Sequence, residues 1–194
     1  MMFPLLKRHC LNRACNGGLK MRYPPYWPQN LLLLFFLILF LFDYSISSAQ
    51  PKPVDPSKRD KCIVCGMFLY KYPRWTPQIH FKDGKVEHFC SNKCMFAFYL
   101  NLSEFVKKKS KDDIKIIYVR NYYDLKWVDA MKCFFVRNSD VYGPMGRELI
   151  PLKSREEVTT FLEDHGGEII QFENITKELI KELSKGETMM KFKK

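Results

Sequence analysis

The sequence predicts an α+β fold, with two related strand-strand-helix halves, antiparallel sheet and helices packed on it. Two observations predict this class. The order strand, turn, strand, helix is expected over residues 78–109 and again over residues 133–165. The turns that join the paired strands are short, so the strands are expected to run antiparallel rather than to need a crossover helix.

The first half begins with a predicted hairpin. Residues 78–89, QIHFKDGKVEHF, hold two alternating runs on either side of Asp83-Gly84, a pair that suits a tight turn with positive φ. A helix is expected over residues 92–109, because apolar side chains recur there at helical spacing. Ser91, just before it, is a good N-cap.

The last two helices are predicted from their caps. Ser154 is expected to cap a helix over residues 155–165, with Glu157 completing a capping box. A closing helix is expected over residues 174–185, with Asn174 as its cap. The other expected elements are strands over residues 114–118, 133–137, 148–152 and 168–172, and a turn or short helix over residues 124–130.

The first 49 residues read as a signal peptide or an N-terminal membrane segment. Twelve apolar residues at 31–42 follow basic residues and precede Ser47-Ser48-Ala49, the pattern of a cleaved secretory signal. A run of twelve is short of the roughly 20 residues that span a bilayer, which favours cleavage over an uncleaved anchor. Met21 would give an n-region of ordinary length and is an alternative start.

Composition sets the remaining boundaries and the broad class. A proline-rich linker at 50–59, a metal-binding domain at 60–186 and a basic tail at 187–194 follow the leader. The formal charge of +11 suits anionic lipid or an acidic partner, but the chain contains no nucleic-acid-binding motif, so no nucleic-acid partner is expected. No catalytic triad order, phosphate loop or carboxylate pair is present, and we predict that the protein is not an enzyme.

Cysteines recur in two short stretches and are candidate metal ligands. Cys62 and Cys65 form a Cys-x-x-Cys pair, which places two sulfurs within reach of one ion. Cys90 and Cys94 lie one helical turn apart at the start of a predicted helix, where thiolates are favoured. The predicted hairpin returns Cys90 towards the loop that carries Cys65, so all four cysteines are candidate ligands, for one ion or for two.

Two methionines and a histidine extend this set. Met67 follows Cys65 after one glycine, and Met145 lies on a turn between Pro144 and Gly146, an unusual place for a core methionine. His88 lies on the hairpin and could contribute an imidazole. Thiolate and thioether are soft donors that select Cu(I).

Three other uses of the cysteines stay open at this stage. The spacing C-x2-C…C-x3-C also suits a closed structural Zn²⁺ site, as in an interaction or heavy-metal sensing module. In an oxidising compartment either Cys62–Cys65 or Cys90–Cys94 could form a disulfide. A thiol oxidoreductase using the first pair lacks the expected strand–helix context.

Two further residues have structural interpretations. Cys133 lies in the apolar run Cys-Phe-Phe-Val and is predicted to be a buried, inert thiol. His80 alternates with apolar neighbours and is predicted to be exposed.

Several stretches together resemble the NosL family, whose members serve nitrous oxide reductase. The combination of CGM, WVDA and PMG at these separations is specific, although each motif alone is weak. The resemblance runs from about residue 60 to residue 176. The matching stretches are CIVCGM (62–67), QIHFKDGKVEHFCS (78–91), YVRNYYDLKWVDA (118–130), FFVR (134–137), GPMGRELIPLKS (143–154) and FLEDHGGEIIQF (161–172).

The resemblance implies a Cu(I) chaperone with two related halves, located in the periplasm or at the extracytoplasmic face of the inner membrane. Its implied partners are apo nitrous oxide reductase and the associated ABC-type maturation complex. Its implied Cu(I) ligands are Cys65, Met67 and Met145. The chain departs from the family in lacking a cysteine for lipid attachment after the apolar segment, and in having the additional pair Cys90 and Cys94.

Overall fold

The computed structural model describes residues 50–191, and side chains as far as residue 185. The predicted signal or membrane segment at 1–49 lies outside this range. Among the described residues, no helix has the length and apolar character needed to cross a bilayer. The described part contains two antiparallel sheets, a small hairpin and four α-helices.

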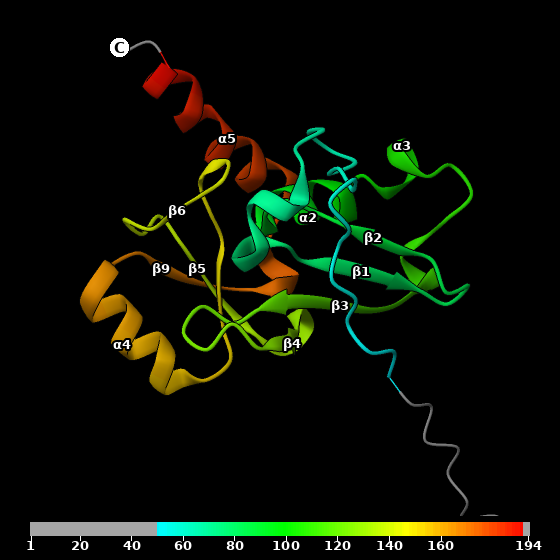
Figure 1. Ribbon diagram of the computed structural model, residues 1–194. Helices are drawn as coiled ribbons and strands as arrows, with labels where there is room; N and C mark the ends of the chain where they lie inside the picture. Colours follow the sequence, from blue (N-terminus) through cyan, green and yellow to red (C-terminus); the bar gives the residue numbers. More distant parts are fainter. Residues whose placement is uncertain (1–49, 192–194) are drawn as a thin grey trace, which may run out of the picture. The chain divides into compact units, whose positions relative to one another are not determined.

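The first sheet has the strand order β2-β1-β3-β4 and is antiparallel throughout. Its strands are β1 (Gln78–Phe81), β2 (Val86–His88), β3 (Ile114–Arg120) and β4 (Trp127–Asp129). β1 and β2 form the predicted hairpin, and Gly84 in its turn has φ 86°. The linker crosses this sheet, because the Tyr118 hydroxyl donates to the Pro51 carbonyl over 2.9 Å (Figure 1).

The second sheet has the order β8-β5-β9 and repeats the topology of β2-β1-β3. Its strands are β5 (Phe134–Arg137), β8 (Ile150–Leu152) and β9 (Glu168–Gln171). A two-stranded hairpin, β6 (Tyr142–Gly143) and β7 (Gly146–Arg147), is inserted between β5 and β8. The expected α+β class with two related halves is confirmed.

The α-helices of the described part are α2 (Asn92–Leu100), α3 (Leu102–Phe105), α4 (Arg155–His165) and α5 (Lys177–Lys191). α2 and α3 follow β2, α4 follows β8, and α5 follows β9. α4 has the predicted bounds, whereas the helix predicted over 92–109 is broken at Asn101. That residue has φ −124°, and its side-chain Nδ2 donates to the Ala97 carbonyl over 2.9 Å. Short 3-10 turns occupy Leu69–Lys71, Pro73–Trp75, Lys111–Asp113, Ala130–Lys132 and Phe172–Asn174.

Two sequence predictions about local structure were wrong for reasons of tertiary packing. Residues 124–130 were expected as a turn or short helix, but Trp127–Asp129 forms β4, because the end of β3 offers it a pairing edge. Asn174 does not cap the last helix. The Thr176 hydroxyl accepts a hydrogen bond from Leu179 N over 3.3 Å instead, and the preceding 3-10 turn buries Ile175.

The predicted capping box at α4 is half formed. Ser154 Oγ accepts from Glu157 N over 3.3 Å, as expected. The Glu157 carboxylate accepts from Lys153 N over 3.2 Å, one residue before the expected Ser154 N.

One large buried cluster joins both halves and includes Cys62, Cys90 and Cys94. Phe96 of α2 contacts Phe135 of β5 and Phe172, with ring centroids 5.2 and 5.0 Å apart. A smaller cluster lies under α4. The predicted exposure of His80 was wrong: its ring is buried, donates to Gln78 Oε1 over 2.6 Å and packs edge-on against Tyr118.

Candidate metal centre

Four cysteine sulfurs lie together at one side of the first half. The Sγ atoms of Cys62, Cys65, Cys90 and Cys94 are all within 4.8 Å of one another. The Cys65–Cys90 and Cys90–Cys94 sulfur separations are 3.3 and 3.6 Å. Four sulfurs around one ion at 2.3 Å would be about 3.8 Å apart, so these thiols already approximate a tetrahedral cage. All four are free thiols, and neither of the suggested disulfides is present.

The first pair of cysteines is placed by a tight loop. Cys62 N donates to the Met67 carbonyl over 2.9 Å, and Gly66 N donates back to the Cys62 carbonyl over 2.8 Å. Gly66 has φ 74°, a conformation that side chains other than glycine adopt at a cost. The loop closes with a β-bridge between Lys61 and Phe68. Local hydrogen bonds therefore turn Cys62 and Cys65 towards the same point.

The second pair is placed by the start of α2. Ser91 is the N-cap, and its hydroxyl accepts from Cys94 N over 3.2 Å. Cys90 immediately precedes this cap, so the two sulfurs lie one turn apart at the positive end of the helix dipole. The cap at Ser91 thus explains why two cysteines four residues apart, Cys90 and Cys94, place their sulfurs close together.

Burial and hydrogen bonding divide the four thiols into two kinds. Cys62, Cys90 and Cys94 are buried, whereas Cys65 is exposed. Hydrogen bonds from the Cys90 and Cys94 thiols hold the pKa of Cys62 far below its usual value. The same bonds to the Cys62 sulfur raise the pKa of Cys90 and Cys94, and burial adds to this effect. In the metal-free cluster the negative charge therefore lies on the Cys62 sulfur, which the Cys90 and Cys94 thiols stabilise by hydrogen bonding. A soft cation could replace the protons on these thiols.

The other predicted ligands lie outside this group of four. Met67 and Met145 are half-buried and pack against the cluster that contains the buried cysteines. Met145 occupies the turn of the β6–β7 hairpin. His88 Nε2 donates to the Val54 carbonyl over 2.9 Å, and His88 is not one of the four residues whose ligand atoms converge. A site shared by Cys65 and both thioethers stays a prediction.

A set of contacts that sequence reasoning missed joins the Met145 hairpin to the start of α2. Lys93 N donates to Glu148 Oε1 over 2.6 Å, and the Lys93 ammonium donates to the Met145 carbonyl. Asn92 Nδ2 donates to the Leu149 carbonyl over 2.9 Å. Burial raises the pKa of Glu148 to about 7. No local sequence signal marks these residues, because the two segments are more than 50 positions apart.

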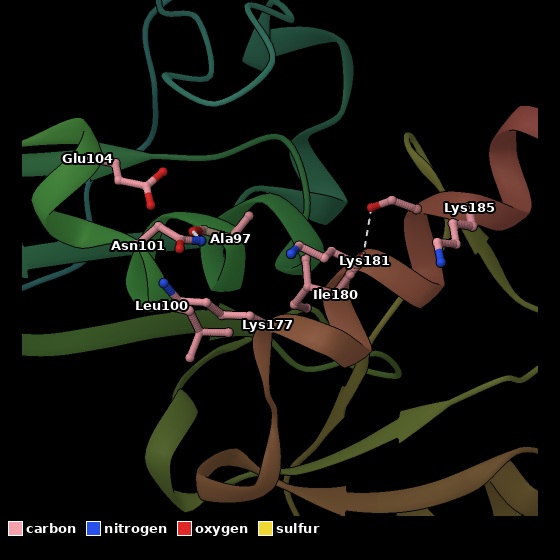
Figure 2. A pocket seen from close by; sticks show the side chains of 9 residues that line it. Ala97, Leu100, Asn101, Glu104, Lys177, Ile180, Lys181 and Lys185 are labelled. Carbon is pink, nitrogen blue, oxygen red and sulfur yellow. Dashed lines mark hydrogen bonds between the residues drawn. The ribbon is translucent and has the colours of Figure 1, made fainter.

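A groove of about 670 Å³ lies elsewhere, between α2, α3 and α5 (Figure 2). It contains none of the predicted metal ligands. Its lining residues are Ala97, Leu100, Asn101, Glu104, Lys177, Ile180, Lys181, Ser184 and Lys185.

The fold and the site define an α+β protein in which four thiols converge where a loop meets a helix start. Comparison with known proteins names its family: the NosL family profile matches residues 53–180, and the chain belongs to this family. The resemblance drawn from the motifs is thereby confirmed.

Two relatives illustrate the match. The chain is 27% identical over 139 residues to the copper-binding lipoprotein NosL of Stutzerimonas stutzeri, covering 68% of this chain and 70% of that protein. The crystal structure of the copper chaperone NosL from Shewanella denitrificans has a TM-score of 0.56 at 24% identity, covering 67% of this chain and 98% of that one. The structural likeness supports the fold.

Proposed function

We propose that the protein is an exported copper(I) metallochaperone that delivers copper for assembly of nitrous oxide reductase. The observation that carries this proposal is the convergence of four thiols within 4.8 Å, one of them exposed. Met67 and Met145 pack against the buried cluster that contains the other three. Such soft donors select Cu(I) over harder ions. Relatives named as a copper-binding lipoprotein and a copper chaperone support the same cargo.

The difference in exposure between the four thiols suits a protein that must hold a metal ion and then release it. Cys62, Cys90 and Cys94 are buried and retain the ion, whereas Cys65 is accessible to an incoming ligand. Met67 and Met145 supply thioethers, which cannot form disulfides and therefore stay available in an oxidising compartment. A low-coordinate ion can accept a partner's donor before it loses Cys65. No step in this scheme requires catalysis by the protein.

The location and partners belong to the same proposal. The leader directs the protein to the periplasm or to the outer face of the inner membrane, where it stays attached if the segment is not cleaved. Apo nitrous oxide reductase and its ABC-type maturation complex are the proposed partners.

A second function is favoured by one observation. The near-tetrahedral spacing of four sulfurs is also that of a structural zinc site, which would make the domain a zinc-stabilised interaction or metal-sensing module. Elemental analysis of the exported protein separates the two. Stoichiometric zinc held by all four cysteines, without affinity for Cu(I), would select the module.

The test of the chaperone is Cu(I) competition against a chromophoric chelator. We expect Cys65→Ala to weaken Cu(I) binding at least about tenfold, the equivalent of losing ~1.4 kcal/mol of binding free energy. Cys133→Ala is the matched control, because Cys133 is a buried thiol outside the cluster whose sulfur donates to the Asp129 carbonyl. Equal affinities for the wild type and Cys65→Ala would remove Cys65 from the site.

A further inference from the structure

Three large apolar side chains on the cysteine loop are exposed to solvent. Ile63, Phe68 and Tyr70 are 41%, 39% and 48% exposed, and they flank the exposed Cys65 in sequence. The same segment buries Leu69 completely, so it has a core-facing side and keeps these three outside it. We call Ile63, Phe68 and Tyr70 the apolar rim. Exposed apolar groups gathered in one place are typical of a binding surface.

Contacts within the loop hold Phe68 and Tyr70 of the apolar rim together. The rings of Phe68 and Tyr70 meet edge to face, with centroids 6.1 Å apart. The Lys61 ammonium lies 4.7 Å from the Phe68 ring centroid, and Lys61 and Phe68 are bridge partners. The loop follows the linker and lies beside α2 (Figure 1, cyan to teal). The rim is therefore presented by an ordered loop, beside the candidate metal centre.

The surroundings of the apolar rim are basic. Lys58, Arg59, Lys71 and Arg74 are exposed, and none of them is in an ion pair within the described part of the chain. The single acid between them in sequence, Asp60, accepts a hydrogen bond from Ser57 N over 2.7 Å. A partner that covers this surface would gain by carrying acidic groups around an apolar centre.

We propose that this surface, the apolar rim with its basic surround, is the docking site for the protein that exchanges metal with Cys65. Its occupant is a folded partner with an apolar contact face, an acidic border and a soft metal ligand. The inference rests on the proposed function. Transfer begins when the partner's sulfur or imidazole binds the ion as the bond to Cys65 breaks. It is completed as further partner ligands replace Cys62, Cys90 and Cys94, and the released thiolates take up protons from solvent, without a change of oxidation state. During transfer the Cys65 sulfur and the partner's ligand both bind the ion, at about 2.3 Å for sulfur or about 2.0 Å for imidazole. The partner must therefore approach Cys65 closely enough to cover the apolar rim around it.

Copper transfer to two acceptors tests the proposal. The full chain, loaded with Cu(I), is mixed either with purified apo nitrous oxide reductase in the presence of its ABC-type maturation complex, or with a small bidentate Cu(I) chelator. We expect the double variant Phe68→Ser/Tyr70→Ser to load the reductase at least about tenfold more slowly, as expected for loss of central aromatic contacts. Its copper affinity and its transfer to the chelator, which needs no docking, should be unchanged.

The matched control is Tyr123→Ser/Ile169→Ser, which removes two apolar side chains that are 42% and 49% exposed, one on the loop between β3 and β4 and one on β9. This control should transfer copper to both acceptors at the wild-type rate. A charge series uses Arg59→Glu/Lys71→Glu against Lys107→Glu/Lys108→Glu, which changes net charge equally. Only the first should slow loading of the reductase, and the wild-type rate should fall as salt is added.

The outcomes separate the surface from the function on which it rests. If the wild type loads the reductase and the rim variant loads it equally fast, delivery stands and the docking site is wrong. If the wild type gives copper to the chelator but never to the reductase, the delivery proposal is wrong and the occupant proposed for the rim fails with it. If the rim variant also loses affinity for Cu(I) in chelator competition, the side chains support the metal site and the docking assignment is overturned.

Discussion

The loop that carries Cys62 and Cys65 has a counterpart with the same backbone between β3 and β4, in the segment that precedes the second sheet. There, Asn121 N donates to the Lys126 carbonyl over 2.9 Å, as Cys62 N does to Met67 over 2.9 Å. Leu125 N donates back to the Asn121 carbonyl over 3.0 Å, the counterpart of the Gly66 to Cys62 bond. Leu125 has φ 56°, close to the 74° of Gly66.

The flanking residues and the following helices also correspond. Arg120 pairs with Trp127 and lies 3.9 Å from its ring centroid, as Lys61 pairs with Phe68. Ser154 caps α4 as Ser91 caps α2. The cysteines on either side of Ser91 therefore correspond to a lysine and a glutamate, Lys153 and Glu157.

The chemistry of the two junctions differs although their backbones agree. Asn121 Nδ2 donates to Asp124 Oδ1 over 2.8 Å, and the Lys153 ammonium donates to Asp124 Oδ2 over 2.6 Å and lies 3.1 Å from Glu157 Oε1. These four polar side chains join loop to helix without an ion. The thiols of the first half make only weak hydrogen bonds to one another. The two junctions therefore differ in what lies between loop and helix: a network of polar side chains in one, and four thiols that could hold a metal ion in the other.

The largest change in local dynamics expected from this difference is that of metal removal. Stripping bound metal with a chelator should speed amide exchange in the loop at 61–68 and the first turn of α2 by about 100-fold, because a ligand at 100 times its Kd contributes ~2.7 kcal/mol. The corresponding amides at 120–127 and at the start of α4 should not change. Hydrogen exchange with mass spectrometry checks this. Equal acceleration at both junctions would break the comparison.

The first junction also relies on Glu148, which should give it a pH dependence. Burial raises the pKa of Glu148 to about 7, so the folded state keeps a proton that the unfolded state releases above its own lower pKa. Stability should therefore fall by up to roughly 3 kcal/mol as pH rises from about 4.5 to 7. Urea unfolding should show that Glu148→Gln removes much of this fall. Glu163→Gln, an exposed change on α4, should leave it intact.

The shared positive φ can be probed at both loops. Gly66→Ala should cost about 1 kcal/mol, because it forces a side chain into the left-handed region although a Cβ there meets nothing within 4 Å. Leu125→Asn should change stability in the opposite direction, since asparagine tolerates that region better than leucine. Denaturant unfolding of the metal-free protein measures both. If Gly66→Ala leaves the free energy of unfolding unchanged, the loop relaxes around the new side chain, and the positive φ shared by Gly66 and Leu125 is not a constraint on stability.

The smallest effect is expected at the polar junction. The Lys153 ammonium, which donates a hydrogen bond to Asp124, holds the pKa of that carboxyl below its usual value. Its stabilisation is present above the unfolded pKa of about 3.9 and is lost as pH falls through the lower folded pKa. Because the Asp124–Lys153 ion pair is partly exposed to solvent, Asp124→Asn should cost only about 0.5 kcal/mol at pH 7, and progressively less as pH falls below about 4. Cu(I) affinity should not respond, which a chelator titration would show.

Features that depend on neighbours along the chain were predicted well from the sequence. The turn at Gly84, the caps Ser91 and Ser154, and the bounds of α4 at Arg155–His165 are set within one or two turns of backbone. The convergence of the four cysteines was also predicted. The Cys62–Cys65 spacing and the Cys90–Cys94 spacing each place sulfurs locally, and the β1–β2 hairpin returns the chain to the first loop.

Only the tertiary structure decided which distant groups meet. It buried His80, made Trp127–Asp129 a strand along the edge of β3, and joined Lys93 to Glu148. It also showed that Asn121 stands where the first half has Cys62. Local propensities and caps act over a few residues and are therefore readable in sequence. Burial, edge pairing and hydrogen bonds between segments more than 50 positions apart depend on how the whole chain packs.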